Sequence, residues 1–114
     1  MRKLFFAIVV FTQLAGATSA AVAPKVALST TRIATPGHVI VRGSGFTPSA
    51  NISSHLVRPD GAEYPVLPLL TNDKGEFTHD IDTLVLTLGV HRLWVVDDRS
   101  KVPSNRVQFE VTSR

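Results

Sequence analysis

The chain has 114 residues, no cysteine and a formal net charge of +3. A chain of this length builds one hydrophobic core with no room for a deep internal cavity, so a small-molecule substrate pocket is not expected, and no disulfide supports the fold. After position 20 the basic residues are scattered singly among acids, which argues against a nucleic-acid-binding stripe.

Residues 1–20 have the layout of a bacterial secretory signal peptide. Arg2 and Lys3 precede the apolar run LFFAIVVF, and the segment closes on Ala-Thr-Ser-Ala. The run is shorter than the roughly 20 apolar residues that span a bilayer, although an uncleaved one-helix anchor remains the alternative. We expect cleavage after Ala20 or Ala21 and a periplasmic or secreted protein. The mature net charge would be 10 − 9 = +1, because two basic residues leave with the signal.

The first half of the remaining chain alternates apolar and polar residues, which predicts short β-strands. Residues 21–25 form a leader. Gly43 and Gly45 allow a bend, and Phe46 is expected to fold back over the end of the core. Pro65 confines its strand to a sheet edge, because proline donates no backbone hydrogen bond. The predicted strands span residues 26–33, 38–42, 51–58 and 62–66, after which residues 67–71 are expected to cross to the other sheet.

The second half continues the pattern after the turn Asn72-Asp73-Lys74-Gly75. Residues 84–88 are expected to form an apolar cap without a helix, and residues 98–104 a polar loop. The predicted strands span residues 76–82, 90–97 and 105–112. We therefore predict an all-β fold, a single immunoglobulin-like sandwich of about seven strands over residues 26–114.

The turn and core residues resemble one known family. They are V-x-V-x-G-x-G-F-x-P from Val39 to Pro48, PDG from Pro59 to Gly61, NDKGEF from Asn72 to Phe77, and GVHRLWVVDD from Gly89 to Asp98. Together these motifs are similar to the bacterial immunoglobulin-like domains of cell-surface and periplasmic proteins, over nearly the whole chain after residue 23. The resemblance implies a role in adhesion, spacing or docking, and it transfers no catalytic residue.

The histidines are the residues that could bind a metal ion. None forms a close His-x-His or His-x3-His pair, so we expect no metal site. His91 takes the position of the tyrosine that bonds back to the chain in antibody domains, and we expect it to hydrogen-bond the cap. A buried, pH-responsive His91 is the alternative. The four histidines are His38, His55, His79 and His91.

The acids and serines give no catalytic pattern. The tract from Asn72 to Glu76 is too short for a calcium loop, which needs six or more oxygen ligands. The sequence contains no Gly-x-Ser-x-Gly elbow, so we expect neither an enzyme nor a cofactor. Four further acids are expected to be solvated loop residues rather than an acid–base pair; these are Asp80, Asp82, Asp97 and Asp98.

Strand alternation also predicts a binding surface. If Ile52, Ser54 and Leu56 face the core, the residues between them face solvent, and strands 51–58, 90–97 and 105–112 are neighbours in this architecture. The only tryptophan of the chain then lies at the centre of the outer face, and tryptophan and arginine are enriched at binding hot spots. Alternatively, loop 98–104 or the leader covers the tryptophan. The candidate binding residues are His55, Val57, Arg92, Trp94, Val96 and Arg106.

These features together predict an exported, non-catalytic module that docks onto an envelope protein or a surface polymer. One alternative is a structural subunit of a larger envelope assembly, contributing an edge strand or its leader. Another is a small periplasmic metal-handling protein. We expect no nucleic-acid partner, and contact with a membrane only through an uncleaved signal segment.

Overall fold

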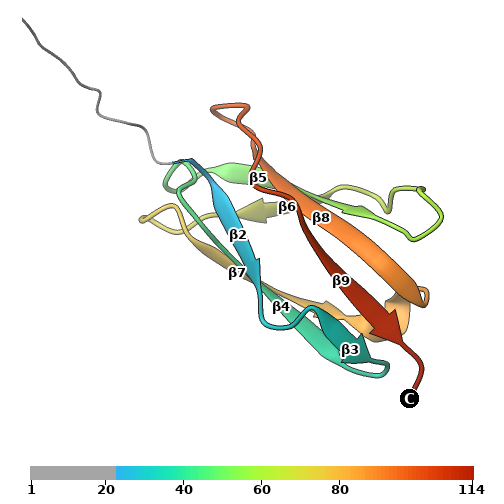
Figure 1. The fold of residues 1–114 in the computed structure, drawn as a ribbon. Helices are drawn as coiled ribbons and strands as arrows, with labels where there is room; N and C mark the ends of the chain where they lie inside the picture. Colours follow the sequence, from blue (N-terminus) through green and yellow to red (C-terminus); the bar gives the residue numbers. More distant parts are fainter. Residues whose placement is uncertain (1–22) are drawn as a thin grey trace, which may run out of the picture.

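Eight strands form from the alternating stretches of residues 23–114, the part of the chain that the computed structural model describes (Figure 1). The predicted signal peptide lies outside the described residues. The elements are β2 (Lys25–Leu28), β3 (Arg32–Ala34), β4 (His38–Ser44), β5 (Asn51–Val57), β6 (Leu67–Leu70), β7 (Phe77–Asp82), the 3-10 turn η2 (Thr83–Val85), β8 (Gly89–Asp97) and β9 (Val107–Thr112). Within residues 23–114, no helix has the length and apolar character to cross a membrane.

The strands pack as two sheets face to face. One sheet has the order β2-β4-β7 and the other the order β3-β9-β8-β5-β6. The central strands therefore follow the orders that immunoglobulin domains use for strands A-B-E and G-F-C. The all-β sandwich prediction is confirmed, with one strand more than expected.

The core lies between the two sheets and contains the residues that alternation predicted. Phe46 is buried and meets Phe77 edge to face, with ring centroids 5.6 Å apart, so the prediction that it covers the end of the core is confirmed. Gly43 has a different role from the predicted bend: it lies within β4, and a Cβ there would overlap the Phe77 ring. The buried core cluster consists of Val26, Val39, Val41, Phe46, Ile52, Phe77, Ile81, Leu93, Val95, Phe109 and Val111.

The predicted single strand 26–33 is wrong, because the chain changes sheets there. β2 pairs with β4 in one sheet, whereas β3 pairs in parallel with β9 in the other. Between them, the Ser29 hydroxyl accepts a hydrogen bond from the Ile40 amide at 2.9 Å, and the Thr30 hydroxyl donates to the Arg32 carbonyl at 2.9 Å. These side-chain oxygens satisfy backbone groups at the break, so the strand can leave one sheet and join the next.

The predicted strand 62–66 and the crossing at 67–71 are also wrong. Only Glu63 forms a bridge, with Val57, and β6 is the strand that adds to the edge of β5. The loop before β6 runs along the edge of β5, where the Tyr64 amide donates to the Leu56 carbonyl at 2.9 Å, and the Tyr64 hydroxyl lies 3.3 Å from Nε2 of His91. The crossing follows at Thr71, whose buried hydroxyl donates to the Thr47 carbonyl at 2.7 Å.

The segment 84–88 covers the core less than predicted. Leu86 alone of its leucines and valine packs against the core cluster, while Leu84, Val85 and Leu88 are 68%, 74% and 54% exposed. The turn is nevertheless firmly held. Thr83 is fully buried, and its hydroxyl donates to the Gly37 carbonyl at 3.0 Å.

Candidate binding face

The outer side of the five-stranded sheet carries all six predicted binding residues. β8 lies between β5 and β9, which confirms the predicted neighbour order. His55 pairs with Trp94, Val57 pairs with Arg92, and Arg106 directly precedes β9. Because neighbouring residues in a strand point to opposite faces, and Leu93 and Val95 are buried, these side chains point away from the core.

Four side chains on this face form one row across the strands. The guanidinium carbon of Arg106 lies 4.1 Å from the centroid of the Trp94 ring. The His55 ring is parallel to the Trp94 ring, with centroids 5.1 Å apart and an interplanar angle of 1°. The Nδ1 atom of His55 lies 3.6 Å from a carboxylate oxygen of Glu63. We call Arg106, Trp94, His55 and Glu63 the cross-strand row.

The row covers Trp94 in a way that the sequence did not predict. β9 and β5 flank β8 on opposite sides, so Arg106 and His55 approach the indole from opposite sides. The tryptophan is half-buried, and Arg106 and His55 are two of the side chains that contact its ring. Its ring is therefore held in one orientation by cation–π and stacking contacts.

Glu63 is the member of the row that sequence reasoning missed. It lies in loop 58–66, which β-type contacts hold against β5: the Tyr64 amide donates to the Leu56 carbonyl at 2.9 Å, and the Arg58 amide donates to the Ala62 carbonyl at 2.7 Å. The turn at Pro59-Asp60-Gly61 contained the necessary signal, because a hairpin turn there places Glu63 opposite Val57 and so beside His55.

His91 lies beneath this face and is fully buried. Its ring stacks on Phe109 and Tyr64, and its Nδ1 lies 3.1 Å from the Gly89 carbonyl oxygen at the end of the cap. The Tyr64 hydroxyl bonds His91 Nε2 and also accepts a hydrogen bond from the Thr87 amide at 3.3 Å. The predicted link between His91 and the cap is thus present. Burial lowers the pKa of His91, aided by the charge of Arg58 and opposed by the Gly89 carbonyl.

We expect stability to fall on mild acidification, because burial also lowers the pKa of His79. Each lowered pKa gives stability that is present above the ordinary value of 6.5 and is lost as pH falls toward the folded value, since the unfolded chain then binds more protons. His38 opposes this, because its hydrogen bond to Asp80 raises its pKa and so stabilises the fold at low pH. That pair is exposed and screened, so the two lowered histidines dominate.

Urea unfolding between pH 5 and 7.5 tests this expectation. The midpoint should decrease as the pH is lowered through 6.5, and the decrease should be steeper for His38→Asn, which lacks the opposing pair. A midpoint that stays constant, or rises, on acidification would contradict it.

Asp97 is a buried structural anchor, so its prediction as a solvated loop residue is wrong. The side chain is buried at the end of β8, and one carboxylate oxygen accepts from the amide and hydroxyl of Thr47 at 2.7 and 2.8 Å. The other accepts from the amides of Arg99 and Ser100 at 2.9 and 3.3 Å. Burial raises the pKa of Asp97, but these donors together lower it by more, so the net pKa lies below the ordinary value.

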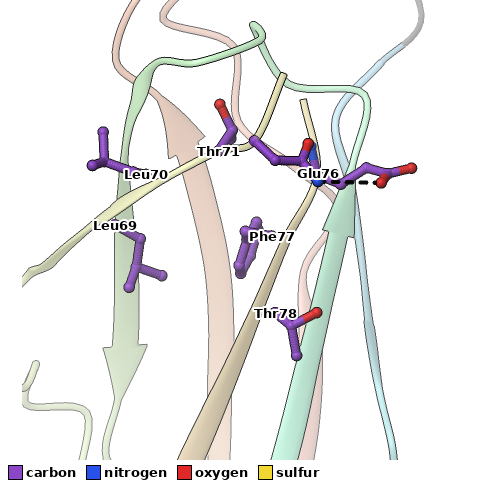
Figure 2. Close-up of a pocket in the computed structure, with 7 residues that line it drawn as sticks. Leu69, Leu70, Thr71, Glu76, Phe77 and Thr78 are labelled. Atoms are coloured by element: carbon purple, nitrogen blue, oxygen red, sulfur yellow. Dashed lines mark hydrogen bonds between the residues drawn. The ribbon is translucent and has the colours of Figure 1, made fainter. Parts of the chain in front are cut away.

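Surface hollows elsewhere are open grooves. One of about 440 Å³ lies where β6 and β7, the edges of the two sheets, approach each other. Figure 2 shows Leu69 and Leu70 along one side of this groove and Phe77 and Thr78 along the other. Glu76 contributes a carboxylate, which is within 3.5 Å of the Asn72 side-chain amide and so helps to close the turn.

The histidines have different contacts in the structure. His38 bonds Asp80, His55 belongs to the cross-strand row, and His91 is in the core. Within residues 23–114, no group of three or more histidine and acidic side chains could hold a metal ion.

Known structures share this fold at low sequence identity. The chain is similar to macromomycin, with 12% identity and a TM-score of 0.52 over 81% of this chain and 100% of that one. It is similar to part of the cell-surface chitinase ChiW from a Paenibacillus species, with 15% identity and a TM-score of 0.50 over 85% of this chain, which spans 10% of the chitinase. A CARDB domain of Pyrococcus furiosus PF1109 gives 11% identity and a TM-score of 0.45, covering 81% of this chain and 93% of that one.

The likenesses to macromomycin and to the chitinase show the β-sandwich fold alone. No protein-family model matches the sequence, and no curated protein matches it.

Proposed function

We propose that this protein is an exported, non-catalytic, immunoglobulin-like binding module of the bacterial envelope, and that it docks onto its partner through the outer face of the five-stranded sheet. The cross-strand row is the observation that carries the proposal. It fixes an aromatic side chain and an arginine, two residue types enriched at binding hot spots, on a regular and exposed sheet. A side chain that is already held in place loses little conformational freedom on binding.

A protein partner fits this face better than a surface polymer. A sugar ring packs flat on an open aromatic face, whereas Arg106 and His55 occupy the two sides of the Trp94 indole. The exposed edge of the ring, together with Val57 and Val96, offers a small apolar contact surrounded by charged side chains. This arrangement is typical of protein–protein recognition.

Capture experiments with Trp94→Ala test the proposal. The substitution should cost the fold about 1 to 2 kcal/mol, from lost stacking and cation–π contacts, and leave it folded. Capture of the partner from an envelope extract should fall at least tenfold. Leu84→Ala is the matched control, because it removes an exposed aliphatic side chain outside this face and should capture as the wild type does.

Site-specific photocrosslinking provides an independent check. A photoreactive residue at Gln108, on the proposed face, should crosslink to the partner, whereas one at Thr78, on the outer side of the other sheet, should not. Equal capture by Trp94→Ala and wild type, or crosslinking from Thr78 alone, would overturn the proposal.

The alternative of a structural subunit draws on the free sheet edges. β6 and β7 end their respective sheets among the described residues. However, Pro68 lies within β6, and Asp80 and Asp82 lie exposed along β7. Proline and charges on an edge strand are the features that prevent another strand from adding to it. The β6 and β7 edges therefore support docking by strand addition less well than the cross-strand row supports docking by the face.

A further inference from the structure

We propose that the partner of this face is a second copy of the same chain, so that two sandwiches associate face to face through their cross-strand rows. This inference rests on the proposed function, for which it names the partner. It follows from the order of charges along the row.

The row is electrically asymmetric. A cation, Arg106, stands at one end and an anion, Glu63, at the other, with Trp94 and His55 between them. Three strand spacings separate the strand positions of the two ends, which is about 14 Å at roughly 4.8 Å for each spacing. Glu63 pairs with Val57, and its side chain joins the row by extending along the strand to His55. The row therefore runs from positive to negative in one direction and from negative to positive in the other.

This asymmetry makes the row complementary to itself. In a symmetric pair the two-fold axis lies in the plane of the interface, and each residue of one copy meets a fixed residue of the other. If the axis runs along the strands and crosses the row at its middle, Arg106 faces the partner's Glu63, and Trp94 faces the partner's His55. Both pairs occur twice, which doubles their contribution.

The same charges exclude the other symmetric arrangement. With the axis running across the strands, along the row, Arg106 would face the partner's Arg106 and Glu63 the partner's Glu63. Like charges placed opposite one another in an interface cost several kcal/mol. The row therefore selects the axis along the strands.

The neighbours of the row agree with this arrangement. By the pairing register, Ser53 lies beside Val96 and Val57 lies beside Arg92 on the same face. The two-fold axis along the strands then brings Val96 to the partner's Ser53, and Arg92 to the partner's Val57. Neither contact opposes like charges, and the apolar stem of an arginine can cover a valine.

Charge reversal tests the pairing. Sedimentation velocity of the full wild-type protein, at concentrations up to about 1 mM, should show a monomer–dimer equilibrium. Arg106→Glu places two acids opposite each other in each contact, and Glu63→Arg places two bases opposite each other. Each variant alone should raise the dimer Kd at least tenfold.

The mixture of the two variants is the decisive sample. When Arg106→Glu meets Glu63→Arg, both contacts again join opposite charges, so the heterodimer should form with a Kd within about threefold of the wild type. Arg42→Glu, an exposed reversal on the outer side of the other sheet, should dimerise as the wild type does. Circular dichroism and thermal melting establish that each variant is folded, and Arg106→Gln, which should weaken the dimer less, replaces any reversal that is not.

The outcomes separate this inference from the proposed function. A wild type that is monomeric at all concentrations, or a mixture that fails to associate, overturns the self-pairing. If capture of a different protein still depends on Trp94, the proposed docking function stands without it. Dimerisation that is lost in each single variant and regained in the mixture supports both.

Discussion

Asp97→Ala is expected to lower the free energy of unfolding by about 3 to 5 kcal/mol, a large share of the total for a domain of this size. The carboxylate accepts hydrogen bonds from Thr47, Arg99 and Ser100, and it is only 2% exposed. Alanine removes the acceptor but leaves the donors in place. Each buried N–H that loses its partner carries the cost of its desolvation.

Asp98→Ala is the matched control, and urea unfolding at pH 7 is the measurement. Asp98 is the adjacent acid, but it is only partly buried and accepts one side-chain hydrogen bond, from the Ser53 hydroxyl at 2.7 Å. Its replacement should cost about 1 kcal/mol or less. Equal losses for the two variants would show that Asp97 is not the anchor of this end of the sandwich.

The acid limb of the stability curve gives a second readout for Asp97. Because its folded pKa lies below the ordinary value of 3.8, it contributes stability that is present above that value and is lost as pH falls through the folded pKa. Asp97→Asn has no such titration. Its stability should therefore change less than that of the wild type below pH 3.8.

Gly75→Ala is expected to destabilise the protein by about 3 kcal/mol or more. Gly75 has a φ of +74°, and a Cβ there would overlap the backbone carbonyl of Phe46. The backbone of Phe46 is also hydrogen-bonded to this turn, because its amide donates to the Gly75 carbonyl at 3.2 Å. A backbone overlap cannot be relieved by changing a rotamer, so the turn and the Phe46 segment must separate.

Gly61→Ala separates the effect of a positive φ from the effect of a backbone overlap. Gly61 also has a positive φ, of +91°, but a Cβ there meets nothing within 4 Å. Its free energy of unfolding should fall by about 1 to 2 kcal/mol, which is the cost of a residue with a Cβ in the left-handed backbone conformation. Thermal and urea unfolding of both variants should show the larger loss at Gly75, and similar losses would mean that the close approach to Phe46 has little effect.

The period-two pattern was sufficient to predict most of the sandwich, because each central strand buries one face. Val39, Val41, Leu93 and Val95 all lie where alternation placed them. Strand 26–33 could not be placed by pattern alone. Whether such a stretch stays in one sheet depends on the hydrogen bonds of the Ser29 hydroxyl to the Ile40 amide and of the Thr30 hydroxyl to the Arg32 carbonyl. The alternation of apolar and polar residues does not predict these bonds.

The candidate binding face could be predicted in part. Alternation put His55, Trp94 and Arg106 on one side of the sheet, but it could not predict that their side chains stack in a row, because that depends on rotamers and on the twist of neighbouring strands. Asp97 was misjudged for a related reason. Its place before a polar loop resembles that of a solvated acid. Two of its hydrogen-bond donors come from Thr47, which is distant in sequence, and the local pattern around Asp97 does not predict that contact.

The transfer of the chain from β2 to β3 also determines how the domain bears tension. Figure 1 shows the start of β2 and the C-terminus at opposite ends of the sandwich, with β3 and β9 side by side. When the two ends are pulled apart, β3 is drawn one way through β2 and β9 the other way, so the parallel seam between them is loaded in shear. Hydrogen bonds in a sheared seam resist together, whereas those of a peeled hairpin break one at a time. The seam contains bonds from the Glu110 amide to the Thr31 carbonyl at 2.8 Å and from the Thr35 amide to the Thr112 carbonyl at 2.9 Å. We therefore expect this seam, in a domain without a disulfide, to be the part that resists when the two ends are pulled apart.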